Sequence, residues 1–258
     1  MDFIRNLGAS TINYVSGMGN MALFLIKTLI YGFTPPLKVI NLLKQIRFIG
    51  TQSIFLIALI GAFTGMVLSL QGYYTLNKVG SVAFLGPMVA LSIIKELGPV
   101  LAGLMVTARA GSAITAEIGI MRISNQIDAI EMMGLNPFRY LVVPVFFAGI
   151  ISLPLLTQIF DLIGIFGGYL VGVKMLGVGS GTYLGEIPNY LDMNDVLEGL
   201  YKSISFGVII SWVSCYKGYY TGTSGYGAEG VSKATTQSVV LSSAMILIWD
   251  YFMTALLF

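Results

Sequence analysis

The residues of this chain best suited to bind a polar ligand are charged residues within apolar sequence. Lys95 and Glu96 stand side by side in a long apolar run shortly before Pro99. Proline lacks an N–H and its ring clashes with the carbonyl four residues earlier, so Pro99 predicts a kink and a freed carbonyl at Lys95. The two charges could bind a polar ligand or simply pack the helices. We favour ligand binding, because adjacent helical residues point about 100° apart and cannot fully satisfy each other.

Three more charged residues interrupt apolar sequence, and each allows two interpretations. The ammonium of Lys202 could extend to the outer headgroups, or it could join Lys95 around an anionic group. Asp161 and Asp250 could form part of a proton pathway, but we favour buried partners in helix packing.

The sequence offers no sign of catalysis or of nucleotide binding. It contains no histidine and a single cysteine, Cys215, which removes the usual general base and any multi-cysteine metal site. Gly225 and Gly230 have the spacing of a phosphate-binding loop, but Val231 and Ser232 follow where lysine and serine or threonine are needed. The net charge of +2 is too small to indicate nucleic-acid binding. We therefore expect a non-enzymatic chain without a metal or cofactor of its own.

The composition indicates the class of protein that holds these residues. Hydrophobic residues make up 56% of the 258 residues and charged residues only 10%, so a water-soluble fold would expose large apolar patches. The pattern predicts an all-α integral membrane protein with five spans at about 52–72, 84–110, 141–176, 198–216 and 237–257. We interpret 141–176 as one long kinked helix, and a hairpin that turns near Pro154 is the alternative.

Residues 1–50 form a separate region before the transmembrane domain, which comprises residues 51–258. Residues 8–31 are moderately apolar and end before the proline pair at 35–36. In residues 37–50, apolar positions alternate with basic ones: Leu37, Ile40, Leu43 and Ile46 against Lys38, Lys44 and Arg47. We predict that both segments are amphipathic helices on the cytoplasmic membrane surface, where anionic lipid attracts lysine. The alternative, a short span over 21–31, falls well below the ~20 residues that a crossing needs.

The distribution of basic residues predicts the orientation. With the N-terminus in the cytoplasm and the C-terminus outside, ten basic residues are cytoplasmic and two are outside, as the positive-inside rule requires. The cytoplasmic ones are Arg5, Lys27, Lys38, Lys44, Arg47, Arg109, Arg122, Arg139, Lys217 and Lys233, and the outer ones are Lys78 and Lys174. The hairpin alternative weakens this ratio to eight against four.

The polar stretch at 109–137, between the second and third spans, predicts a cytoplasmic amphipathic helix. Its isoleucines recur at helical spacing and would form one apolar face, Gly134 would cap the helix and Pro137 would stop it. Anionic lipid would repel its three acids, so we favour docking into a groove of a soluble ATPase over lying on the membrane. The coupling residues we expect are Glu117, Ile120, Arg122, Ile123, Ile127, Asp128, Ile130, Glu131, Met132, Met133 and Gly134.

Several ordered motifs resemble the MlaE/YrbE family of permeases, and the resemblance extends from about residue 50 to the end of the chain. They are LQGY at 70–73, KELGP at 95–99, ARAGSA at 108–113, AEIGIMR at 116–122, QI at 126–127, EMMG at 131–134, Pro137, ISLPLL at 151–156 and KATT at 233–236. Lys95 stands where an arginine is common, and it offers a point charge in place of a planar fork.

The resemblance implies the membrane subunit of an ABC transporter in the inner membrane of a Gram-negative bacterium. It would move phospholipids between the inner and outer membranes and so maintain the lipid asymmetry of the outer membrane. It implies a homodimer, two ATPase subunits that bind ATP and Mg²⁺, a ring of MCE-domain lipid-binding proteins on the outer side and a small cytoplasmic accessory subunit. The region 117–134 would be its coupling helix.

We expect an outward-facing cavity between two copies, with lipid-binding residues of two kinds. Acyl chains would contact Leu68, Leu70, Tyr73, Tyr74 and Leu76, and the polar head would lie near Lys95, Glu96 and Lys202. The two tyrosines could also be part of an interfacial aromatic belt. An ion-coupled secondary transporter remains an alternative, with Glu96, Asp161 and Asp250 as its candidate ion site, and a lipid-modifying enzyme is disfavoured because no catalytic constellation is visible.

Overall fold

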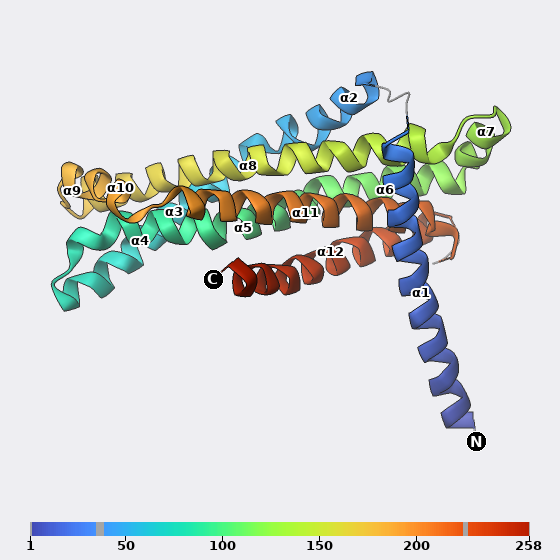
Figure 1. The fold of residues 1–258 in the computed structure, drawn as a ribbon, viewed down its shortest axis with the longest axis horizontal. Helices are drawn as coiled ribbons and strands as arrows, with labels where there is room; N and C mark the ends of the chain where they lie inside the picture. Colours follow the sequence, from blue (N-terminus) through green and yellow to red (C-terminus); the bar gives the residue numbers. More distant parts are fainter. Residues whose placement is uncertain (1, 35–38, 224–226, 258) are drawn as a thin grey trace.

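The computed structural model describes residues 2–34, 39–223 and 227–257, and within these ranges it contains helices and no strand (Figure 1). Five helical segments are long and apolar enough to cross a membrane: Val39–Val79, Val82–Ile123, Phe138–Met175, Met193–Tyr219 and Gly227–Leu256. The predicted all-α class with five candidate spans is confirmed. The predicted proline pair at 35–36, with Leu37, Lys38 and Gly225, lies outside the described residues.

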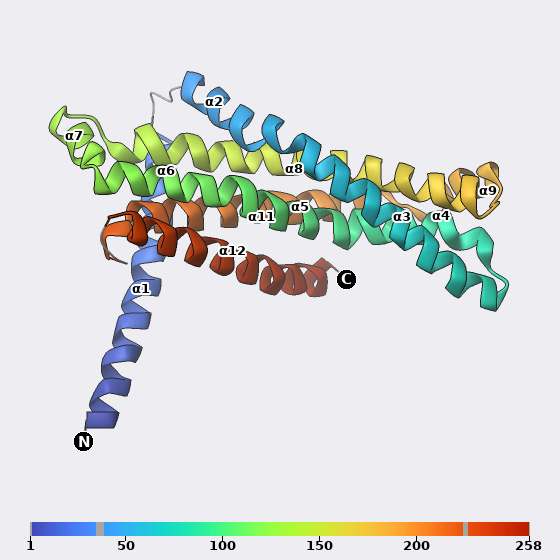
Figure 2. The same cartoon turned by 180° about the vertical axis from the view of Figure 1, so that it is seen from behind.

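The helix predicted over 37–50 and the first predicted span form one continuous helical segment. Helix α2 (Val39–Ile49) continues through a single 3₁₀ turn, η1 (Thr51–Ser53), into α3 (Ile54–Val79) (Figure 2). Ser53 donates a hydrogen bond to the carbonyl of Ile49, and Arg109 donates to the carbonyl of Phe48 and to Ser53, so the junction is held from two sides. Because α2 also packs along α8, it is joined to the bundle and is not an isolated surface helix.

The second span is a chain of helical pieces. It comprises η2 (Val82–Phe84), α4 (Leu85–Ser92), η3 (Ile93–Leu97), α5 (Gly98–Val106), η4 (Thr107–Gly111) and α6 (Ser112–Ile123). The elements η3 and η4 are π-helical turns, which widen the helix locally. The kink predicted at Lys95–Pro99 therefore takes the form of the π-helical turn η3. The span continues to Ile123, so the first half of the predicted coupling helix belongs to it.

The predicted single helix over 109–137 is wrong, because the chain turns within it. Helix α6 ends at Ile123, Asn125 adopts a left-handed conformation with φ 55°, and a short helix α7 (Gln126–Met132) follows. Asparagine tolerates this conformation better than most residues, so the turn falls where the sequence permits it. Gly134, at φ 75°, then reverses the chain as its predicted capping role required.

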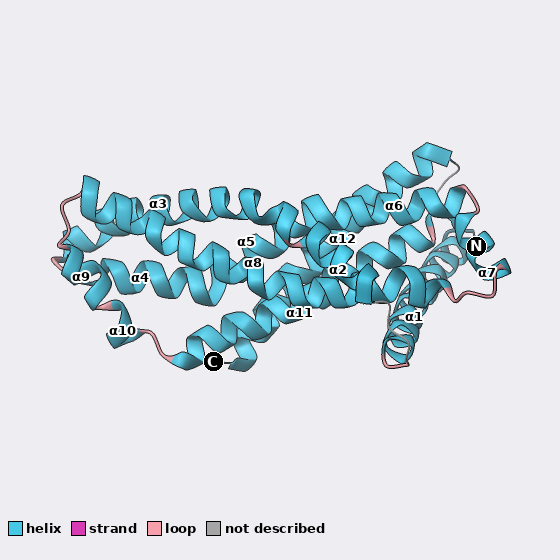
Figure 3. Ribbon diagram, turned by 90° about the horizontal axis from the view of Figure 1, so that it is seen from above, coloured by secondary structure: helices cyan, strands magenta, loops and turns pink. Residues whose placement is uncertain are grey.

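The third span runs without interruption along the whole bundle (Figure 3). It comprises η5 (Phe138–Val142), α8 (Val143–Tyr169), which holds Pro154 inside it, and η6 (Leu170–Met175). The long single helix is confirmed and the hairpin is wrong. Two short helices, α9 (Ser180–Gly185) and α10 (Ile187–Tyr190), lead to α11 (Met193–Tyr219), which η7 (Thr221–Thr223) connects toward α12 (Gly227–Leu257).

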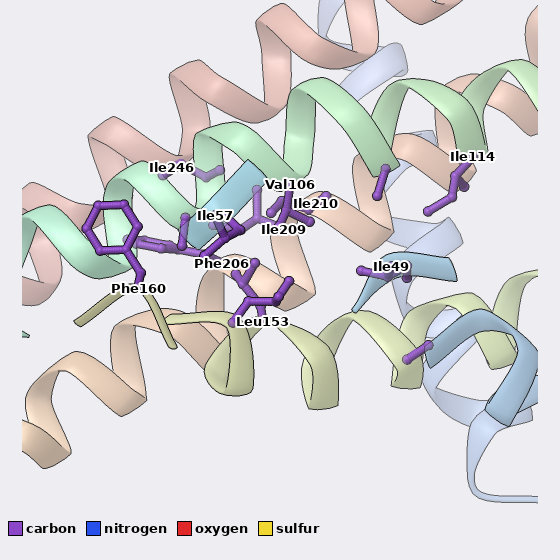
Figure 4. Packing of buried hydrophobic residues seen from close by; sticks show 14 of the residues in the cluster. Ile49, Ile57, Val106, Ile114, Leu153, Phe160, Phe206, Ile209, Ile210 and Ile246 are labelled. Carbon is purple, nitrogen blue, oxygen red and sulfur yellow. The ribbon is translucent and has the colours of Figure 1, made fainter. Parts of the chain in front are cut away.

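Helix α8 packs against α3 and α11 at the centre of the bundle. Isoleucine, leucine and phenylalanine side chains from α2, α3, α5, α6, α8, α11 and α12 meet there (Figure 4). Glycines let α3 and α8 approach closely: a Cβ on Gly65 would overlap the carbonyl oxygen of Gly164. Gly164 is the first of three glycines four residues apart, at 164, 168 and 172, and association of helices in lipid depends on close packing of this kind.

Helix α1 (Asp2–Gly32) crosses the bundle at the end that carries α7 (Figure 1). Phe24 is buried among Phe138, Tyr216 and Tyr219, with ring centroids 5.1–5.9 Å away. Trp212 Nε1 donates a hydrogen bond of 2.9 Å to the carbonyl of Met21. Helix α1 is therefore attached to α11 and to the start of span 3, while its interfacial position stays a prediction.

Candidate functional site

A network of charged side chains links the π-helical turn η3 to the start of α11. Lys95 Nζ lies 3.0 Å from Asp195 Oδ1 and 3.2 Å from Glu198 Oε2. The side chain of Glu198 is 8% exposed, whereas those of Lys95 and Asp195 are 22% and 17% exposed. The two ion pairs of Lys95 therefore link a buried carboxylate, Glu198, to the partly exposed side chains of Lys95 and Asp195.

Lys202 lies at the centre of the network, and its side chain is fully buried. Its Nζ donates hydrogen bonds to the carbonyl of Lys95 at 3.0 Å and to Thr254 Oγ1 at 2.7 Å. It also lies 2.8 Å from Glu96 Oε1 and 3.5 Å from Asp250 Oδ1. The carbonyl of Lys95 is the one that Pro99 deprives of its helical partner, so the ammonium of Lys202 replaces the missing N–H.

Carboxylates outnumber ammonium groups in this network by four to two: Glu96, Asp195, Glu198 and Asp250 against Lys95 and Lys202. Both lysines are compensated by their own chain. The extension of Lys202 toward the outer headgroups is excluded, and no surface of its side chain is left for a ligand. The position of Asp250 agrees with the packing role expected of it, since its ion pair with Lys202 joins α12 to α11.

The sequence analysis missed Glu198 and Thr254, and it placed Asp195 outside the spans. One signal was present: Glu198 and Lys202 are four residues apart, the spacing of an ion pair along a helix, and their side chains lie 3.6 Å apart. Thr254 gave no such signal. Its hydroxyl bridges Lys202 and Glu96 only because α12 passes beside η3 in the fold.

Asp161 is buried on α8, and its Oδ1 has no hydrogen-bond partner in the described part of the chain. A Cβ on Gly98 would overlap this oxygen, so the carboxyl group packs directly against the second span just after η3. The packing role expected of Asp161 agrees with this position.

The residues expected to contact acyl chains lie on the last turns of α3. Leu70 is 39% exposed and Tyr74 61%, while Leu68, Tyr73 and Leu76 are half-buried and pack against the core. The rings of Tyr73 and Tyr74 lie 6.3 Å apart. On the N-terminal side of Leu70, the same exposed face of α3 carries Phe55, Leu59, Phe63 and Val67. Helix α3 therefore presents an uninterrupted apolar surface to its surroundings.

The predicted coupling segment, residues 117–134, is held by contacts with the end of α11. Arg122 pairs with Asp128 at 2.7 Å across the turn between α6 and α7, and its guanidinium lies 5.6 Å from the ring centroid of Tyr219. The hydroxyl of Tyr219 lies 3.5 Å from Glu131 Oε1. A single tyrosine of α11 thus contacts both sides of the turn.

The four isoleucines do not form one face. Ile127 is fully buried and Ile130 is 7% exposed, whereas Ile120 is 52% and Ile123 38% exposed. The turn at Asn125 rotates α7 relative to α6, so residues that share a face in one continuous helix point in different directions here. The exposed apolar residues of α6, α7 and the loop after them include Ile120, Ile123, Met132, Met133 and Leu135, and the two methionines are 84% and 67% exposed. Ile127 and Ile130 are part of the chain's own core.

Comparison with known proteins identifies the family. The family model described as "Permease MlaE" matches residues 42–256, which is most of the chain. The chain belongs to the MlaE permease family. This MlaE permease is 43% identical over 258 residues to a "Probable ABC transporter permease protein" of Rickettsia bellii, with 100% of this chain and 98% of the relative covered.

Two more relatives of this MlaE permease carry informative names. It is 41% identical over 260 residues to the "Intermembrane phospholipid transport system permease protein MlaE" of Haemophilus influenzae, covering 100% of this chain and 98% of the relative. It is 32% identical over 218 residues to the chloroplastic protein TRIGALACTOSYLDIACYLGLYCEROL 1 of Arabidopsis thaliana, covering 84% of this chain and 61% of the relative. The charge network, the apolar face of α3 and the coupling segment all lie within the residues that the family model matches.

Proposed function

We propose that this chain is the permease subunit of an ABC transporter that moves phospholipids between the inner and outer membranes of a bacterium. The observation that carries the proposal is the family match over residues 42–256, together with a relative named for intermembrane phospholipid transport that is 41% identical over the whole chain. Five candidate spans support a multi-pass protein of the inner membrane. Such transport would maintain the lipid asymmetry of the outer membrane.

The transporter that we propose is an assembly. Two copies of this chain form a homodimer with two ATPase subunits on the cytoplasmic side, and the ATPases bind ATP and Mg²⁺. A ring of MCE-domain proteins lies on the outer side, and a small accessory subunit on the cytoplasmic side. The N-terminus is cytoplasmic and the C-terminus is outside, so α7 and the end of α6 face the ATPases.

The lipid cavity lies between the two copies. Acyl chains contact Leu68, Leu70, Tyr73, Tyr74 and Leu76 of α3. Exposure supports Lys95 and Glu96 as the polar groups closest to a headgroup, since their side chains are 22% and 38% exposed. Because Lys202 is fully buried, it acts on the lipid only through Glu96 and the carbonyl of Lys95, which it holds in place.

The ATPases act on the end of the bundle that carries α7. The apolar side chains that enter the groove of each ATPase are those of Ile120, Ile123, Met132 and Met133. The polar rim around them consists of Glu117, Arg122, Asp128 and Glu131. Ile127 and Ile130 support α7 from inside, and Gly134 reverses the chain beyond it. When ATP closes the ATPases, α7 is pushed and the movement reaches α6, which is continuous with η3 and Lys95.

Met132→Arg tests the docking surface. Met132 is 84% exposed, so the substitution leaves the fold intact but places a charge in the apolar contact, and we expect the ATPase to be lost on co-purification. Met175→Arg is the matched control, because Met175 is 76% exposed at the other end of the bundle. If the Met132→Arg variant retains the ATPase as fully as the control, the docking surface is wrong.

Photo-crosslinkers test the cavity. At Leu70 and Tyr74, in the assembled transporter, we expect capture of phospholipid that increases when ATP is absent and decreases when nucleotide closes the ATPases. Leu162, which is 71% exposed on α8, is the control for ordinary bilayer contact. Capture at Leu70 and Tyr74 that equals capture at Leu162, and does not respond to nucleotide, would place these residues on the bilayer surface and not in the cavity.

A further inference from the structure

A polar cavity lies between α2, α6 and the start of span 3, away from the charge network. Its volume is about 210 Å³, several times what one ordered water needs. Its apolar wall includes Ile114 and Ile118 of α6 and Leu141 of η5. Its polar lining consists of Asn41, Lys44, Gln45, Glu117 and Tyr140.

Helix α2 indicates where this cavity lies with respect to the membrane. Val39, Ile40 and Leu43 of α2 are 59–71% exposed, whereas the polar residues Asn41 and Gln45 turn inward and line the cavity. Leu42, Ile46 and Phe48 pack inward against the core, and Lys44 and Arg47 are exposed beside the outward apolar residues. Exposed apolar residues next to exposed cations are typical of a helix at the membrane interface, so we place the outer face of α2, and the cavity behind it, at the membrane boundary.

The polar groups of the cavity present an incomplete set of interactions. Gln45 Oε1 is buried and accepts no hydrogen bond from any described residue. Lys44 and Glu117 line the same cavity with opposite charges, and neither forms an ion pair within the described part of the chain. A buried acceptor without a donor is costly, so this site favours a ligand that brings N–H groups to Gln45.

We propose that this cavity binds the headgroup of a membrane phospholipid that carries both a phosphate and a primary ammonium. The phosphate pairs with Lys44, and the ammonium lies between Glu117 and Gln45 Oε1. The acyl chains pass over the exposed apolar face of α2 into the bilayer. A choline headgroup has the same charges but no N–H to donate, and a glycerol headgroup has no cation for Glu117, so both fit less well.

This site is separate from the lipid cavity of the proposed transport cycle. The transport residues lie on the last turns of α3 and on η3, whereas this cavity lies beside α2 and α6, near the end that carries α7 (Figure 2). A lipid bound there contacts α2, α6 and span 3 together. It would thus connect the leading helix of span 1 to the helix that continues into the coupling turn. Glu117 also belongs to the proposed polar rim for the ATPases, so a lipid bound here would lie at the edge of that rim. The lipid readout below does not depend on transport activity.

The experiment measures retained lipid. The full chain, purified with its co-eluting subunits, is placed in nanodiscs that contain equal amounts of phosphatidylethanolamine, phosphatidylcholine and phosphatidylglycerol, and a photo-crosslinker at Asn41 records the headgroup beside it. We expect phosphatidylethanolamine to be captured about fivefold more than phosphatidylcholine, the factor expected for one net hydrogen bond. Gln45→Leu should remove this preference, and Lys44→Met should reduce capture of all three lipids. Arg47→Met is the matched control, because Arg47 is an exposed cation of α2 outside the cavity lining.

Two results would overturn the proposal. One is equal capture of the three lipids by the wild-type chain and by Gln45→Leu, with both proteins shown to be folded by an unchanged melting midpoint. The other is capture of an ATPase peptide at Asn41 in place of lipid, which would show that a partner protein occupies the cavity. Should Gln45→Leu fail to fold, Glu117→Gln provides a second test: it should lower the preference for phosphatidylethanolamine over phosphatidylglycerol, and an unchanged preference would reject the ammonium site.

Discussion

Lys202→Met removes the buried cation that three carboxylates share, and it is the most informative single substitution in the network. Lys202 Nζ lies 2.8 Å from Glu96, 3.5 Å from Asp250 and 3.6 Å from Glu198. Methionine keeps much of the side-chain volume, so the change is mainly electrostatic. Loss of one partner from a buried ion pair costs ~3–5 kcal/mol, because the remaining charge stays buried without compensation. Glu96 is 38% exposed and partly screened by solvent, so we expect a value at the lower end, ~3 kcal/mol.

Thermal unfolding in mild detergent measures this loss. The chain has two tryptophans, Trp212 on α11 and Trp249 on α12, and their fluorescence reports on the two helices that Lys202 joins. For a chain of this size, ~3 kcal/mol lowers the melting midpoint by ~6–12 °C. Lys174→Met is the control, because Lys174 is an exposed lysine on η6 and its loss should leave the midpoint unchanged.

A double variant separates charge from packing. Lys202→Met/Asp250→Asn removes one buried carboxylate together with the cation, so it should be more stable than Lys202→Met alone, although it has one more substitution. A midpoint for Lys202→Met within about 2 °C of wild type would refute the reasoning, since the size of the expected shift follows from the buried charges. A double variant that is no more stable than the single one would also refute it, because the loss would then be due to packing.

Two contacts elsewhere in the bundle can be tested by substitution, and the predicted orientation can be tested by labelling. Gly65→Ala should cost ~1–3 kcal/mol and lower the melting midpoint, because the new methyl group overlaps the carbonyl oxygen of Gly164, whereas Gly181→Ala, with open space around it, should have little effect. Arg109→Met should speed hydrogen exchange at the junction of α2 and α3, because it removes the donor to Phe48 and Ser53; exchange as slow as in wild type would show that packing alone holds the junction. The orientation can be tested with cysteines at Ser180 and Ser232, since the native Cys215 is buried and should stay unlabelled. A membrane-impermeant maleimide should label Ser180→Cys from the outer side and Ser232→Cys only after the inner membrane is opened, and the reverse pattern would contradict the N-in, C-out orientation.

Local patterns in the sequence predicted the class of fold and the site where the backbone of the second span is disturbed. Long apolar runs cannot remain in water, and a backbone in lipid must satisfy its own hydrogen bonds, so five helical spans follow from composition and length. Pro99 identified a carbonyl without a partner, and the structure provides that partner in Lys202. The glycines at 164, 168 and 172 are four residues apart and so share a helix face, and α3 approaches α8 closely at Gly164. Each of these features depends on residues close together in the sequence.

The contacts between groups far apart in the sequence depend on how the helices pack. Glu198 meets Lys95, and Thr254 meets Lys202, because α11 and α12 pass beside η3, and no local pattern predicts a contact between residues more than 50 positions apart. The isoleucines at 120–130 looked like one face because helical periodicity assumes a continuous helix. A single left-handed residue, Asn125, ends that continuity and turns Ile127 into the core while Ile120 stays outside. Periodicity predicts which residues share a face only as far as the helix itself extends, and the packing of α7 against the rest of the chain sets that limit.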